Sequence, residues 1–244
     1  MPLMDEFKEE REEVKNRSFK ERMKYFWDYY KWHVIGTVIG IIVVISLIHT
    51  FLSQKETVYY SVFINVAETW DSEDYRKEFE TLAGINKKKE AVIFDADMRM
   101  DLTLMDQSTF NTTQKIMVYL SAKELDSMLA DRGAINQYAY NDVLLDLREF
   151  LTAEELELYA PYLYYMDRSL LEVTDEDPTG QIPYPEDPND ASAMKEPVPV
   201  GLLLPECPKF RTAYSCGSEQ YFCIFVNSQH PESNRLFFDY LMEN

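Results

Sequence analysis

Histidine is the side chain that most readily moves protons near neutral pH, and the chain has three. His33 and His49 flank or enter a long apolar run, so only His230 lies in the segment that follows it. A Ser-His-Asp or Cys-His site would therefore depend on that one imidazole. The sequence has no Gly-x-Ser-x-Gly motif, no His-Glu-x-x-His motif and no glycine-rich phosphate loop. We therefore expect a protein that is not an enzyme and has no catalytic residues.

Four aspartates are spaced like ligands of a cation: Asp95, Asp97, Asp101 and Asp106. A calcium loop needs glycine at its turn position and a bidentate glutamate at its last position. Met100 occupies the turn position and Asp106 the last one. We expect a solvated acidic turn here, with no metal and no cofactor. No spacing elsewhere selects a carboxylate pair of the kind that a glycosidase uses.

The three cysteines all lie near the carboxyl end, at Cys207, Cys216 and Cys223. An odd count in an exported domain permits at most one internal disulfide. Cys216 and Cys223 could face each other across a hairpin, or Cys207 could pair with either of them. The other interpretation is three buried thiols that pack as small apolar residues.

Residues 34–52 form an apolar run without Asp, Glu, Lys or Arg. As a helix, the run spans roughly 28 Å, which matches the hydrocarbon core of a bilayer. It is longer than the apolar region of a signal peptide, begins after 33 residues and is followed by no small-x-small cleavage site. The run therefore predicts one transmembrane helix that acts as an uncleaved signal anchor.

Basic residues flank the run unequally, which predicts its direction across the cell membrane. Only Lys55 lies within about 20 residues after it. Those before it are Lys15, Arg17, Lys20, Arg22, Lys24 and Lys31. We expect a cytoplasmic amino terminus, a single pass and an extracytoplasmic carboxyl-terminal domain.

Aromatic residues before the run are typical of a belt at the membrane interface. They are Tyr25, Phe26, Trp27, Tyr29, Tyr30 and Trp32. Ser18 and Glu21 have the spacing of a capping box, so the helix is expected to begin near Ser18. Gly36 and Gly40 have the spacing that lets two membrane helices approach closely, which would permit a homodimer.

The charge lies almost entirely after the membrane run. Residues 1–31 hold eight basic and eight acidic side chains, so the net charge of −19 belongs to the segment that follows. Such an acidic domain repels phosphate groups, and nucleic-acid binding is therefore disfavoured. Its acidity either keeps an exported domain soluble or serves a cationic ligand or partner.

The outer segment begins as an α/β layer. Residues 57–66 and 90–94 are rich in β-branched and aromatic residues and predict strands. Between them, a helix is expected from Asp71 or Ser72 to Gly84. The next stretch is ambiguous: residues 115–120 form a strand, or all of 108–125 is helical and 126–130 is the strand.

The later elements are expected in a regular order, interrupted by one long loop. Residues 172–199 hold six of the eleven prolines and many acids, which indicates an exposed loop. Around it we expect short helices at 136–140 and 152–165, an extended piece at 144–147, strands at 198–204 and 220–226, and a terminal helix at 231–242.

Several stretches resemble extracellular solute-binding proteins of bacterial transporters. They are residues 123–131, 135–139, 144–151, 199–202, 221–228 and 238–241. The resemblance implies an α/β fold in which one mixed-sheet lobe, flanked by helices, remains and the second lobe is reduced or lost. It also favours the helical alternative for 108–125. Residues 25–33 resemble the start of uncharacterised single-pass membrane proteins of low-GC Gram-positive bacteria.

The sequence thus predicts five segments: a cytoplasmic tail at 1–33, a transmembrane helix at 34–52, an α/β domain at 53–171 and 198–244, and an acidic loop at 172–197. The first functional hypothesis is a non-enzymatic, membrane-anchored domain that binds a small ligand or a protein partner at the cell surface. The second is a structural or regulatory subunit that pairs through its transmembrane helix.

Overall fold

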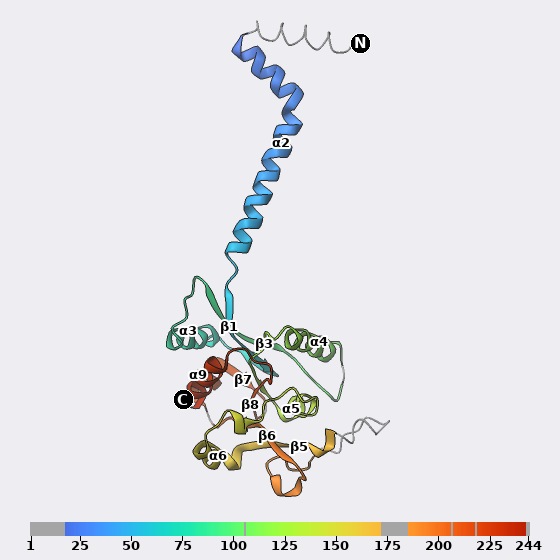
Figure 1. Cartoon of the computed structure of the whole chain (residues 1–244), viewed down its shortest axis with the longest axis vertical. Helices are drawn as coiled ribbons and strands as arrows, with labels where there is room; N and C mark the ends of the chain where they lie inside the picture. The colour runs from blue at the N-terminus through green and yellow to red at the C-terminus, as the bar shows by residue number, and fades with distance from the viewer. Residues whose placement is uncertain (1–17, 105, 172–184, 206, 218, 243–244) are drawn as a thin grey trace. The chain divides into compact units, whose positions relative to one another are not determined.

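The structure is a computed structural model that describes residues 18–104, 106–171, 185–205, 207–217 and 219–242 (Figure 1). It divides into an amino-terminal unit, Met1–Gln54, and a globular unit, Lys55–Asn244. The prediction of an α/β fold with one apolar helix and a mixed sheet flanked by helices is confirmed.

The described part of the amino-terminal unit contains one helix, α2 (Phe19–Leu52). Its segment Tyr30–Thr50 has a mean hydropathy of 2.1 and is long and apolar enough to cross a membrane. At 34 residues, the whole helix is about 51 Å long, because each residue adds about 1.5 Å. It therefore exceeds a hydrocarbon core of about 30 Å.

The globular unit contains a six-stranded sheet in the order β3-β1-β4-β8-β6-β5. Strand β1 (Glu56–Ile64) lies between two parallel neighbours, β3 (Glu90–Met98) and β4 (Ser127–Ala130). Strand β8 (Tyr221–Ile224) runs antiparallel to β4 and to β6 (Pro197–Leu203). Strand β5 (Leu163–Asp167) forms the far edge, antiparallel to β6.

Both faces of the sheet are covered, which explains why its strands are apolar on both sides. On one face, a cluster of aromatic rings joins the sheet to α3 (Ser72–Leu82), α8 (Pro208–Ala213) and α9 (Pro231–Met242). On the other face lie α4 (Gln107–Ser121) and α5 (Arg132–Ala139). Figure 1 shows α3 and α9 on the opposite side of the strands from α4 and α5.

Two predictions about residues 108–165 have different outcomes. The favoured alternative for 108–125 is confirmed, because α4 is helical and β4 follows it as the strand. The helix predicted for 152–165 is wrong beyond its first turns. Helix α6 (Ala153–Tyr159) ends before a short 3-10 turn that contains Pro161, and β5 starts at Leu163. Proline has no N–H to donate and clashes with the preceding turn, so the helix stops there.

Two further boundaries and one small sheet differ from expectation. Helix α5 begins at Arg132 rather than Asn136, because Asp131 caps it. A small second sheet pairs β2 (Val66–Glu68) with β7 (Tyr214–Cys216), and the sequence did not predict it. Most of the predicted acidic loop, residues 172–184, lies outside the described residues, and its end at Pro197 already belongs to β6.

Candidate functional site

The topology brings three strand ends together at one edge of the sheet. From β1 the chain passes through α3 to β3, on one side of β1, and then through α4 to β4, on the other side. The connection that leaves β1 therefore runs toward one edge of the sheet and the connection that leaves β4 toward the other, so the switch point lies between β1 and β4. In open α/β sheets, ligands bind outside the carboxyl ends of the strands at such a switch point.

Asn65, the residue after β1, ties these ends together. Its side-chain amide donates to the Met100 carbonyl at 2.8 Å and to the Asp131 carboxylate at 2.7 Å, and its oxygen accepts the Met100 N–H at 2.9 Å. Asn65 also has a φ of 58°, in the left-handed region that asparagine tolerates better than most residues. One side chain thus links the segments that follow β1, β3 and β4.

The segment after β3 folds onto the start of α4. Asp101 accepts the N–H groups of Thr103 and Leu104 at 2.9 and 3.1 Å, and the Thr103 hydroxyl at 2.6 Å. These bonds lower the pKa of Asp101, and the bond from the Thr103 hydroxyl contributes most. Asp106 caps α4 by accepting the Thr109 N–H at 2.8 Å, which lowers its pKa as well.

The segment after β4 is built in the same way. Asp131 caps α5 by accepting the Ala134 N–H at 3.0 Å with one oxygen, while the other oxygen accepts from Asn65. The next side chain, Arg132, donates to the carbonyls of Pro185 and Glu186. The amino ends of α4 and α5 therefore converge on the same edge.

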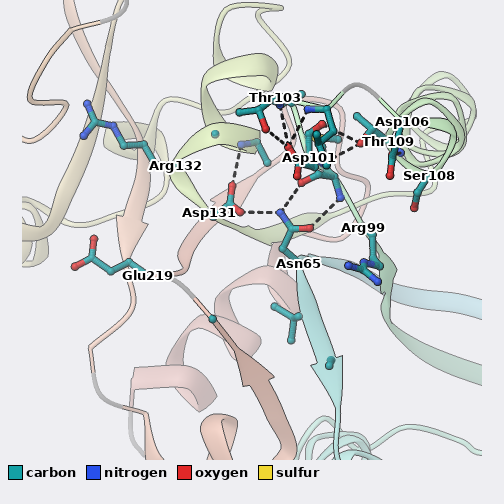
Figure 2. A pocket seen from close by; sticks show the side chains of 18 of the residues that line it. Asn65, Arg99, Asp101, Thr103, Asp106, Ser108, Thr109, Asp131, Arg132 and Glu219 are labelled. Carbon is teal, nitrogen blue, oxygen red and sulfur yellow. Dashed lines mark hydrogen bonds between the residues drawn. The ribbon is translucent and has the colours of Figure 1, made fainter.

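These segments line a cavity of about 1060 Å³, which β7 and the start of β8 complete. Figure 2 shows Asn65, Asp101 and Asp131 at its centre, with Asp106, Ser108 and Thr109 on one side and Arg132 and Glu219 on the other. The cavity has the size of a small-molecule site.

Several polar groups of the cavity stay available to a ligand. Within the described part of the chain, no hydrogen bond engages the side chains of Arg99, Ser108, Ser215 or Glu219. The three aspartates instead accept N–H and hydroxyl groups of their own segments, and Asp131 also accepts an N–H of Asn65. The described lining contains neither histidine nor cysteine, so it offers no imidazole or thiol to a substrate. The groups that stay available are a guanidinium, a carboxylate and two hydroxyl groups.

His230, the imidazole singled out by the sequence, lies elsewhere. Its Nδ1 is 3.1 Å from both carboxylate oxygens of Asp126, which precedes β4. The Ser228 hydroxyl donates to the same carboxylate at 2.6 Å, and the Tyr60 N–H donates to it at 2.9 Å. A catalytic triad places histidine between serine and carboxylate. Here the serine hydroxyl bonds to the carboxylate instead, so the three residues are not arranged as a triad.

The four aspartates with cation-like spacing do not converge. Asp95 accepts hydrogen bonds from Lys115 and Tyr60, at 2.8 and 3.0 Å, and also accepts the N–H of Asp97. Asp101 and Asp106 organise the turn and the helix cap described above. No group of three or more potential metal ligands occurs among the described residues.

The cysteines are free thiols. Cys207 and Cys223 are buried, and Cys216 is half-buried. The predicted alternative in which Cys216 and Cys223 face each other across a hairpin is wrong. Strand β7, which carries Cys216, pairs with β2, while β8, which carries Cys223, pairs with β4 and β6. Burial raises the pKa of Cys207 to about 11.

The predicted membrane residues all lie on α2. Phe26, Trp27, Tyr30 and Trp32 are exposed, and the rings of Phe26 and Tyr30 stack with centroids 5.2 Å apart. Tyr25 and Tyr29 belong to the helix, but their side chains lie outside the described residues. A Cβ atom added to Gly36 or Gly40 meets nothing within 4 Å, so both glycines face open space.

Comparison of the chain with protein-family models, curated proteins and solved structures finds no match. The resemblance to solute-binding proteins therefore stays a prediction. Sequence reasoning missed the cavity, although Asp106 and Asp131 each have the spacing of a helix cap. Combined with the strand order, those caps would have placed two helix starts at one edge.

Proposed function

We propose that the chain is a membrane-anchored binding protein whose globular domain lies outside the cell and takes up a polar ligand at the switch-point cavity. The observation that carries this proposal is the cavity between the carboxyl ends of β1 and β4, lined by the starts of two capped helices. Asn65 holds its parts in place before any ligand arrives. Such preorganisation reduces the entropic cost of binding.

The composition of the lining supports recognition rather than catalysis. Arg99 and Glu219 supply opposite charges, and Ser108 and Ser215 supply hydroxyl groups. A ligand with several hydrogen-bonding groups fits this set better than an apolar one. The anchor supports the same function, because α2 carries the apolar segment next to the globular unit in sequence.

Thermal unfolding of the full chain in detergent tests the proposal with a panel of sugars, amino acids, short peptides and divalent cations. A ligand present at a hundred times its Kd stabilises by about 2.7 kcal/mol. For a domain of this size, that corresponds to a rise in Tm of roughly 5–10 °C. If no compound raises the Tm, small-ligand binding is rejected and a protein partner becomes the remaining hypothesis.

A variant of the cavity gives the matched control. Ser108→Trp places an indole in the cavity from an exposed position at the start of α4. We expect it to abolish the rise in Tm while leaving the ligand-free Tm nearly unchanged. Thr81→Trp, at an exposed position on α3, should keep the full response. An equal response in both variants would place the ligand outside the cavity.

A second candidate function is a structural or regulatory subunit that pairs through α2. The observation that favours it is the open space at Gly36 and Gly40, on a helix segment that is 0% buried in the structure. Crosslinking in membranes of the wild type against Gly36→Leu and Gly40→Leu tests it. Unchanged behaviour of both variants would reject pairing at these glycines.

A further inference from the structure

Helix α4 is the longest of the described helices of the globular unit, and its outward face is uncharged. The helix buries Thr109, Thr112, Ile116 and Leu120. Its one charged side chain, Lys115, is bonded to Asp95 at 2.8 Å. The outward residues include Phe110 and Met117, which are 55% and 49% exposed. Apolar side chains that gather on an exposed helix face point to a binding surface.

The charge of the chain makes this face exceptional. The net charge is −19, and all of it lies in the segment that follows the membrane run. The exposed faces of α3 and α9 carry charged residues such as Glu73, Asp74 and Asp239. Two copies of the domain therefore repel each other over much of their surface. The face of α4 is one where a second copy can approach without burying a charge.

The outward residues also have the spacing of a helix-pairing seam. Gln107, Phe110, Gln114, Met117 and Ser121 follow one another at intervals of three and four. This alternation places them along one stripe, as the a and d positions of a coiled coil. If two α4 helices pack antiparallel about Gln114, then Phe110 of one copy lies opposite Met117 of the other. Sulfur–aromatic contacts of that kind are favourable.

The centre of the seam is also self-complementary. The amide of Gln114 has both donors and an acceptor, so it can bond to the same side chain in a second copy. No hydrogen bond to its side chain is formed among the described residues. A polar residue between apolar seam positions, here Gln114 between Phe110 and Met117, can fix the register of two helices.

The charges at the two ends of α4 favour the antiparallel direction. Asp106 precedes the helix and Lys123 follows it, and both are exposed. Neither forms an ion pair within the described part of the chain. Antiparallel packing brings Asp106 of each copy beside Lys123 of the other, whereas parallel packing places two Asp106 carboxylates together. The antiparallel arrangement also aligns the two helix dipoles favourably.

We infer that the globular domain pairs with a second copy of this chain through antiparallel contact of the two α4 faces. One helix face is small beside the roughly 800 Å² that each partner buries in a standard interface. The inference rests on the proposed membrane anchor in one respect, because confinement to a membrane raises the effective concentration of the copies. Pairing is therefore expected in membranes and not in dilute detergent.

Site-specific crosslinking of the full chain in membranes tests the inference. In a Cys216→Ser background, the remaining native cysteines are buried. Gln114→Cys should then give a dimer with a short bifunctional maleimide, because both copies of residue 114 lie beside the two-fold axis. Gln107→Cys should give at least fivefold less, because seven residues on each side separate its two copies by about 21 Å. Mixing Gln107→Cys with Ser121→Cys should restore the dimer.

Two further variants separate specific pairing from collision. Phe110→Glu adds a charge to the seam, and we expect at least a fivefold loss of the Gln114→Cys dimer. Leu158→Glu alters a residue of α6 that is 66% exposed, and it should change nothing. Equal crosslinking at residues 107 and 114, or no effect of Phe110→Glu, would overturn the inference. Failure of the anchor would appear separately, as release of the chain from membranes by alkaline carbonate.

Discussion

The side-chain amide of Asn65 lies 2.7 Å from the carboxylate of Asp131, so the residue that follows β1 holds the residue that begins α5. Through Met100, the same amide also holds the segment that follows β3. In a parallel sheet, each strand end continues into its own loop. Here the short side chain of Asn65 joins these loops to one another. The shape of the cavity therefore depends on a hydrogen-bond network rather than on loop packing alone.

Replacing Asn65 with Asp keeps the size of the side chain but removes both N–H donors. It also places a second carboxylate beside Asp131. We expect Asn65→Asp to lower the free energy of unfolding by about 2 kcal/mol at pH 7, since the buried Met100 and the half-buried Asp131 both lose their donor. The loss should shrink toward pH 4, where the new carboxyl takes up a proton. Urea unfolding at both pH values measures this, and an equal loss at both would contradict the role of charge.

The buried carboxylate of Asp126 supports a second prediction. It is 1% exposed and accepts the Tyr60 N–H and the Ser228 hydroxyl, in addition to its contact with His230. Asp126→Ala should cost about 3 kcal/mol of unfolding free energy, because buried donors are left unpaired. His230→Ala should cost about 1 kcal/mol, because the imidazole is 32% exposed and water replaces its bond. If the two losses are equal in urea titrations, the imidazole is a main support of the network.

The sequence predicted those elements whose signals are local. Helix α3 follows from its apolar positions, and the strands β1 and β3 follow from apolar runs of the right length, although the side chain of Asp71, which precedes α3, forms no cap hydrogen bond. Helix α9 follows from its periodicity, and its boundaries were predicted to the residue. The sequence did not predict strand β5, because its residues continue the apolar pattern of α6. Pro161 was the available signal that the helix ends before β5.

The candidate site was harder to predict, because its residues meet only through the topology. Asn65, Met100 and Asp131 are each separated by more than 30 residues in sequence. A strand order is not visible in one sequence, so no pattern reveals that the ends of β1, β3 and β4 are neighbours. The left-handed conformation of Asn65 was equally hidden. The caps at Asp106 and Asp131 were the local signals available.

The three thiols support a prediction that needs no variant. Cys216 is half-buried, whereas Cys207 and Cys223 are buried and burial raises the pKa of each. A thiol reacts as its thiolate, so low exposure and a raised pKa both slow modification. A chromogenic disulfide reagent at pH 8 should modify one thiol per chain in the folded protein and three in urea. Modification of three thiols without urea would contradict the burial of Cys207 and Cys223.

The ion pair between Glu155 of α6 and Arg235 of α9 supports a prediction about acid stability. Arg235 donates to both oxygens of Glu155, and Thr152 donates to one of them, so that these bonds lower the pKa of Glu155 to about 2. A carboxyl whose pKa is lower in the folded protein adds stability above its unfolded pKa of about 4.3. That contribution is lost as the pH falls from there toward 2.

Glu155→Gln should therefore lower the free energy of unfolding by about 1–2 kcal/mol at pH 7, a figure reduced by the partial exposure of Arg235. The difference from the wild type should narrow as the pH falls from 4.5 to 2.5. Glu157, on the exposed side of the same helix, has no such partner in the described part of the chain, so Glu157→Gln should change the stability by less than about 0.5 kcal/mol. Urea titrations from pH 2.5 to 7 measure both. Should the Glu155→Gln difference stay constant over that range, the ion pair with Arg235 does not account for it.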